Sequence, residues 1–238
     1  MSGSPAAELV TASRILVAQG VLDAFGHVSL RDPGDPSRFW LSTARPPSAV
    51  TEDDFLQFDL SAEPVEATDA PLFSEGVLHA AIYAARPGAM AVVHHHAPAL
   101  MPFCIGAGRL YPVTQTGGFM GGAVPVWDSA DAFGATNMLV TTMEQARALA
   151  AALGDRPLVL MRGHGATLAA GDLRELVFMA VYSAREAEHF LRAAAFAPPV
   201  PLSAGEVALT CRPARPAIDR GWEHWVATLP ADAKGDSR

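Results

Sequence analysis

The chain has 238 residues, of which 50% are hydrophobic and 18% are charged, and its formal net charge is −8. This composition is typical of a folded globular protein, and the negative charge argues against a general nucleic-acid-binding surface. No apolar stretch reaches about 18 residues without a charge or a breaker, so no membrane-spanning segment and no membrane partner are expected.

The cysteines and the N-terminus indicate a cytoplasmic location. Cys104 and Cys211 lie far apart and have no paired spacing, so we expect two reduced thiols. The N-terminal sequence has no basic segment followed by an apolar core, so no signal peptide is expected.

The first 96 residues alternate helical patterns with short strands. Pro5 suits the first turn of a helix and Gly20 its end, Thr51 can cap a short helical turn, Ser74 can cap a second helix, and Pro87 ends that helix. The expected elements, in order, are a helix over 5–19, strands within 25–33 and 38–43, a turn over 51–55 followed by a strand, a helix over 74–88 and a strand over 89–96.

The remaining chain continues the alternation and ends in a proline-rich segment. Asp172 stands at the start of the longest helical pattern. The expected elements are a brief helix within 98–108, strands over 110–114 and 123–128, a helix over 141–154, a strand over 157–165, a helix over 172–195, an extended segment over 198–216 and a last helix over 219–229.

No internal repeat and no long linker divides the chain, so one α/β domain is expected. We place its boundary at residues 1–197. Residues 198–238 then form a proline-rich tail that packs on the domain or on a neighbouring subunit.

The stretch "AVVHHHAPAL" reads as a buried strand that ends in three histidines. Side chains on a strand alternate between its faces, so His94 and His96 point one way and His95 the other. Two imidazoles on one face can bind a metal ion from one side. The alternative is that both are packed, hydrogen-bonded core residues.

Two further features place polar side chains where they could join this pair. His164 stands between two glycines after an apolar strand, and Glu75 stands in the first turn of a helix. A catalytic metal needs about three protein ligands and one open position. Glu75 could be a fourth ligand or a general acid/base, or it could simply stabilise the helix start. His79, four residues on, could support the site or pack the helix.

The order of "GHVSLR", "SEGVLHAAIYAARPGAMAVVHHHAPA" and "MRGHGATLAAGDL" resembles the class II aldolase/adducin family over roughly residues 7–195. The resemblance implies a single three-layer α/β/α domain with a largely antiparallel central sheet. It implies that His94, His96 and His164 bind a divalent metal, usually zinc, with manganese, iron or cobalt as alternatives. It also implies that Glu75 is the catalytic acid/base and that the enzyme is a homotetramer with active sites at subunit interfaces.

The chain departs from the sugar-phosphate enzymes of that family where they cradle a phosphate. His27 stands in place of an asparagine, Phe73 replaces a serine, and Arg45 enters a turn of small residues, while Ser29 and Ser74 remain as candidate substrate-binding residues. Arg45 offers a planar fork suited to a carboxylate, although it could equally form a surface salt bridge. The departures indicate a flat or carboxylated small-molecule substrate.

These phrases are most similar to a subgroup of decarboxylases for dihydroxyphthalate-type acids and carboxylated hydroxymuconic semialdehydes. The resemblance implies a metal-dependent carbon–carbon lyase, in which Arg45 or His27 orients a carboxylate and Glu75 or His27 delivers a proton. The alternatives are an aldolase acting on a keto or hydroxy acid, an iron-dependent oxygenase and a non-catalytic adducin-like module.

Overall fold

The computed structural model describes residues 4–230; residues 1–3 and the last part of the predicted tail, 231–238, lie outside the described range. Its centre is a seven-stranded sheet in the order β3-β2-β1-β4-β7-β6-β5. All neighbouring strands are antiparallel except β5 and β6. The strands are β1 (His27–Arg31), β2 (Arg38–Ser42), β3 (Phe55–Asp59), β4 (Ala91–His95), β5 (Val126–Trp127), β6 (Leu158–Met161) and β7 (Gly165–Ala170).

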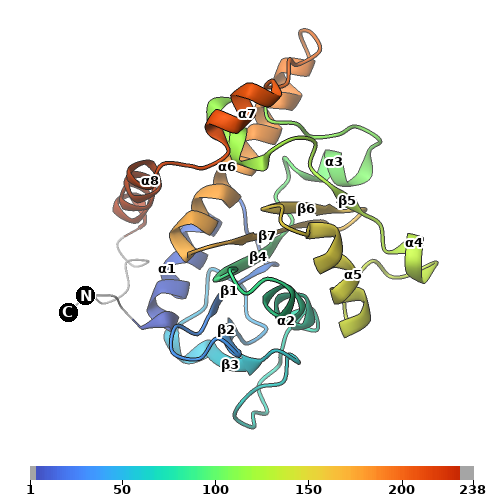
Figure 1. Ribbon diagram of the computed structural model, residues 1–238. Coiled ribbons are helices and arrows are strands. Elements are labelled where there is room, and N and C mark those ends of the chain that lie inside the picture. Colours follow the sequence, from blue (N-terminus) through green and yellow to red (C-terminus); the bar gives the residue numbers. More distant parts are fainter. Residues whose placement is uncertain (1–3, 231–238) are drawn as a thin grey trace.

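Helices cover both faces of this sheet, so the predicted three-layer α/β/α architecture is confirmed. Helices α1 and α6, with α8 beside them, pack on one face, and α2 and α5 pack on the other (Figure 1). The helices are α1 (Pro5–Ala18), α2 (Gly76–Ala85), α3 (Met101–Ile105), α4 (Ala130–Phe133), α5 (Met143–Leu153), α6 (Leu173–Ala194), α7 (Ala204–Thr210) and α8 (Arg215–Thr228), with 3₁₀ turns η1 (Glu52–Asp54) and η2 (Gln115–Met120).

The two central strands, β4 and β7, supply apolar side chains to both layers. Val93 and Leu168 belong to the core under α1 and α6, whereas Val92 and Ala169 belong to the core under α2 and α5. Successive residues on a strand face opposite sides, so β4 and β7 are covered on both faces.

Helix starts follow the sequence signals at most positions. The Asp172 side chain accepts a hydrogen bond from the Glu175 amide, 2.9 Å away, and caps α6 as expected. The prediction that Ser74 caps α2 is wrong. Helix α2 begins at Gly76, so Glu75 takes the cap position, and Ser74 is exposed.

Two expectations for irregular parts of the chain also differ from the structure. Residues 110–114 form no strand, and the proline-rich segment contains α7, whose start is capped by reciprocal bonds between Ser203 and Glu206. After it, α8 packs against α6 and α1, with Trp222 and Trp225 buried in the core. Within residues 4–230, no helix is long and apolar enough to cross a membrane.

Candidate metal centre and active site

The site begins as a row of side chains across the three central strands of the sheet. His94 on β4 lies opposite His27 on β1 and Thr167 on β7. Directly opposite residues of antiparallel strands project from the same face, here the face covered by α2 and α5. His95 lies opposite Ala166, in the core on the other face, and is fully buried. The predicted separation of His95 from His94 therefore agrees with the strand geometry.

Three imidazoles converge where β4 ends and the β6–β7 hairpin turns. The Nε2 atoms of His94 and His96 are 3.1 Å apart, and one nitrogen each of His94, His96 and His164 lie within 4.8 Å of one another. Gly163, with φ +67°, allows the tight turn that presents His164. The structure thus brings together the three ligands that the sequence predicted, from positions nearly seventy residues apart.

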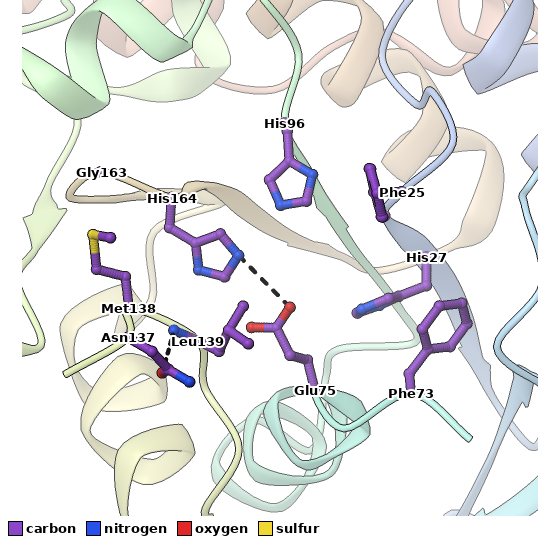
Figure 2. Close-up of a pocket in the computed structure, with 11 residues that line it drawn as sticks. Phe25, His27, Phe73, Glu75, His96, Asn137, Met138, Leu139, Gly163 and His164 are labelled. Carbon is purple, nitrogen blue, oxygen red and sulfur yellow. Dashed lines mark hydrogen bonds and ion pairs between the residues drawn. The ribbon is translucent and has the colours of Figure 1, made fainter. Parts of the chain in front are cut away.

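Glu75 completes the cluster from the start of α2. Its Oε2 lies 3.7 Å from His94 Nε2. The same oxygen lies 3.6 Å from His164 Nε2 (Figure 2). Its Oε1 accepts a hydrogen bond from the Val140 amide at 3.0 Å. Burial raises the pKa of Glu75, although the Val140 amide and the nearby His96 partly oppose that rise. A carboxyl group with a raised pKa, aimed at a cavity, can hold and deliver a proton.

The chemistry of this donor set fits a divalent metal. Burial lowers the pKa of His94, His96 and His164, so their nitrogen lone pairs are free at neutral pH. A tetrahedral zinc ion with Zn–N bonds of about 2.0–2.1 Å requires ligand nitrogens roughly 3.3 Å apart. The 3.1 Å separation of His94 and His96 is close to that value, and the nitrogen of His164 lies within 4.8 Å of both. His94 Nδ1 lies 3.2 Å from Thr167 Oγ1, which orients the ring.

His27 forms the adjoining wall of the site and is almost fully buried. Its ring lies 5.3 Å from that of His94 and 4.5 Å from that of Phe73. Burial, with His96 and His164 nearby, lowers the pKa of His27 to about 3, so its imidazole is neutral. Its Nδ1 lies 2.6 Å from Nε2 of His79. His79 therefore contacts a wall of the cavity through His27 and is also buried under α2, so its position is compatible with both roles considered above.

These groups line a cavity of about 390 Å³. In Figure 2, His27, Glu75, His96 and His164 surround it, with apolar side chains beside them. No Lys or Arg is among the lining residues of the described chain. The lining residues are Phe25, Gly26, His27, Phe73, Glu75, His96, Asn137, Met138, Leu139, Gly163 and His164.

Three residues that the sequence predicted to bind substrate do not line this cavity. Arg45 is half exposed, and its Nε lies 3.4 Å from Asp54 Oδ1 in a surface ion pair. Ser29 is fully buried beneath the site, with its Oγ 2.6 Å from His79 Nδ1. Ser74 is exposed. The alternative reading of Arg45 as a surface salt bridge matches its position, and Ser29 acts through His79 instead of contacting the cavity.

The sequence did not identify the loop that closes the other side of the cavity. Asn137, Met138 and Leu139 line it, and the following Val140 amide holds Glu75. This loop lies between α4 and α5 and carries no motif, so only the folded structure shows that it reaches α2. The exposed Phe25 at the mouth was also not singled out.

Comparison with known proteins agrees with this fold and site. The family model described as the class II aldolase and adducin N-terminal domain matches residues 7–191. The fold resembles a solved L-fuculose 1-phosphate aldolase, with a TM-score of 0.75 and 20% identity, over 89% of this chain and 96% of that one. The three-layer architecture is therefore that of class II aldolases, and the chain belongs to the class II aldolase and adducin family.

Several curated relatives are named as decarboxylases. Decarboxylase tropJ from Talaromyces stipitatus is 29% identical over 197 residues, covering 77% of this chain and 74% of the relative. A 3,4-dihydroxyphthalate decarboxylase from Arthrobacter keyseri is 32% identical over 190 residues, covering 73% and 72%. Decarboxylases and aldolases are both lyases, and this chain is accordingly an enzyme of the lyase class.

Proposed function

We propose that the protein is a divalent-metal-dependent decarboxylase of a flat, hydroxylated carboxylic acid, either aromatic or of the hydroxymuconic type. The observation that carries this proposal is the cavity itself. It joins three neutral imidazoles and one carboxyl group to apolar walls, and no Lys or Arg lines it within the described residues. The relatives named as 3,4-dihydroxyphthalate decarboxylases support an aromatic diacid as the substrate class.

The metal belongs to the three-histidine cluster. Zinc is proposed, although neutral nitrogen ligands also accept manganese, iron or cobalt. His94, His96 and His164 would hold the divalent ion, which would supply Lewis-acid stabilisation of negative charge on the substrate. Glu75 Oε2 lies within 3.7 Å of His94 and His164, so a substrate held at the cluster lies beside Glu75.

Decarboxylation favours a cavity without cationic side chains. The carboxylate carries a full negative charge before the reaction and departs as neutral CO₂. A Lys or Arg beside it would stabilise the ground state more than the transition state and would slow the step. Phe73, Met138 and Leu139 instead provide an apolar wall that a leaving CO₂ can occupy.

Glu75 is the group best placed to protonate the vacated carbon. The carbon–carbon bond breaks, its electron pair stays on the ring or chain carbon, and that carbon takes one proton. The Val140 amide holds one oxygen of the Glu75 carboxyl, and the other oxygen faces the three-histidine cluster. Solvent then returns a proton to Glu75, so the reaction consumes one proton in all.

The oligomeric state and the cellular location form part of the same proposal. The family is often tetrameric and acts on small molecules. We propose a cytoplasmic homotetramer that acts in aromatic catabolism and has active sites near subunit interfaces. Light scattering would test the assembly, because a monomer in solution would contradict it.

The activity is tested with metal-loaded protein and 3,4-dihydroxyphthalate, with related hydroxy acids as further substrates. We expect CO₂ in equal amount to the monoacid product, and no turnover after chelation of the metal. Release of an aldehyde and pyruvate without CO₂ would establish an aldolase instead. Oxygen uptake that requires iron(II) would establish an oxygenase.

A further inference from the structure

A chain of buried polar groups runs from the cavity into the layer between the sheet and α2. His27 Nδ1 lies 2.6 Å from His79 Nε2, and His79 Nδ1 lies 2.6 Å from Ser29 Oγ. Ser29 Oγ in turn lies 2.7 Å from the Tyr83 hydroxyl. His79, Ser29 and Tyr83 are all about 1% exposed or less. The Arg31 guanidinium lies 4.8 Å over the Tyr83 ring and steadies the far end.

The direction of these hydrogen bonds follows from counting protons. Burial raises the pKa of Tyr83, so its phenol keeps its proton and can donate it. If Tyr83 donates to Ser29, Ser29 donates to His79 Nδ1, and His79 Nε2–H donates to His27 Nδ1. Every buried donor in this arrangement has a short acceptor.

The opposite direction leaves one donor poorly placed. If His27 donates to His79 and His79 donates to Ser29, the Ser29 proton needs another acceptor. If it goes to the Tyr83 hydroxyl at 2.7 Å, the Tyr83 proton has no further acceptor among the described residues. The other acceptor within reach is the Val92 carbonyl, at 3.5 Å. That distance exceeds the range of about 2.5–3.0 Å for hydroxyl hydrogen bonds. A buried donor without a proper acceptor is costly, so the first direction is favoured.

We propose that Tyr83, Ser29 and His79 fix neutral His27 as the Nε2–H tautomer, which makes His27 a hydrogen-bond donor for the substrate carboxylate. The carboxylate half of this inference rests on the proposed function. The assignment of the His27 tautomer rests only on the buried hydrogen bonds.

The cavity gives such a donor a role. His27 lines it, and Nε2 has no hydrogen-bond partner among the described residues. No cationic side chain of the described chain lines the cavity. Apart from the three-histidine cluster and Glu75, His27 and the Asn137 amide are the lining side chains that can donate to a carboxylate there. A neutral donor orients the carboxylate without the ground-state stabilisation that an ion pair would add. His79, Ser29 and Tyr83 are positioning residues in this arrangement.

The same series of buried hydrogen bonds indicates that His27 does not supply the proton to carbon. Loss of the Nε2 proton would have to be made good through His79 and Ser29 from Tyr83. That transfer would leave a buried phenolate, which the raised pKa of Tyr83 disfavours. Glu75 therefore keeps the proton-delivering role, and His27 binds.

Nitrogen-15 NMR of the histidine side chains in the metal-loaded protein tests the tautomer directly. We expect protonated Nε2 and bare Nδ1 for both His27 and His79, with His27→Asn and His79→Gln used to assign the signals. Protonated Nδ1 on His27 would overturn the inference. This result does not depend on turnover, so an inactive protein with the expected tautomer would remove the proposed function and leave the tautomer assignment standing.

Kinetics then test the positioning role. His79→Leu removes the donor to His27, whereas His79→Gln keeps an amide N–H of similar reach. We expect His79→Leu to lower kcat/KM by about 10- to 100-fold, mainly through KM, with unchanged metal content. His79→Gln should restore most of that loss. Equal impairment of the two variants, or a loss confined to kcat, would contradict the role assigned to His79.

Discussion

Gly26 packs the backbone before β1 against β4, the strand that carries His94, and its replacement by alanine is expected to damage both the fold and the site. Its φ is +87°, and an added Cβ would lie 2.8 Å from the His94 carbonyl oxygen and 2.6 Å from Leu22 Cδ2. The Leu22 methyl can rotate away, but the carbonyl belongs to a central strand. The left-handed conformation costs about 1–2 kcal/mol and overpacking about 1–3 kcal/mol. Gly26→Ala should therefore destabilise the fold by roughly 2–5 kcal/mol.

Denaturant unfolding monitored by circular dichroism measures the loss, and Gly88→Ala is the matched control. An added Cβ at Gly88 meets no atom within 4 Å, and its φ lies outside the left-handed range. Metal titration of both variants adds a second readout, because any shift of the His94 backbone moves a ligand. If Gly26→Ala unfolds at the same denaturant concentration as Gly88→Ala and binds metal equally well, the reasoning about this close approach is wrong.

Four further perturbations follow from the geometry. His164→Ala removes one ligand of three and should weaken metal affinity by more than about 100-fold in a chelator competition, and retained affinity would exclude His164 from the centre. Glu75→Gln should keep the metal but lose about 10²- to 10⁴-fold in kcat. Full activity of this variant would show that another group donates the proton. Arg45→Ala should leave KM within about twofold, since Arg45 is half exposed and pairs with Asp54 at the surface; a large rise in KM would show that Arg45 binds the substrate. Burial raises the pKa of Cys104 to about 11, so Cys104 stays a protonated thiol at pH 8. A thiol reagent at pH 8 should therefore modify only the exposed Cys211 in the native protein, and rapid loss of two thiols would contradict this.

The convergence of the three candidate ligands could be predicted because each has a local signal. Strand alternation separates His95 from His94, and the glycines around His164 mark a hairpin turn. Glu75 was found from its place at a helix start, although the cap position itself was assigned to Ser74. Such signals depend on a few neighbouring residues and persist in the folded chain.

Features that depend on distant contacts were missed. Strand β7 consists of small residues with weak strand preference, and its pairing with β4 and β6 decides its conformation. The Ser203–Glu206 capping box of α7 was hidden among prolines. Segment 110–114 contains Pro112 and makes no sheet ladder; the amides of Val113 and Thr114 donate instead to the buried Glu186 carboxylate.

The positions of the candidate substrate-binding residues were harder to predict than those of the candidate ligands, because they too depend on distant contacts. Arg45 suits a carboxylate by chemistry, but η1 places Asp54 beside it at the surface. Ser29 could not be recognised as the partner of His79, because 50 residues separate them in sequence. Nothing in the composition of residues 137–140 indicates that they reach Glu75.

The reaction run in D₂O, with the product examined by NMR, tests the central claim most directly. Cleavage of the carbon–carbon bond followed by proton delivery to the vacated carbon predicts one deuterium at the position that lost CO₂, in the wild-type protein loaded with metal. The Glu75→Gln variant should form this product far more slowly at equal metal content. An undeuterated product, or an aldehyde and pyruvate in place of CO₂, would contradict metal-dependent decarboxylation with Glu75 as the proton donor.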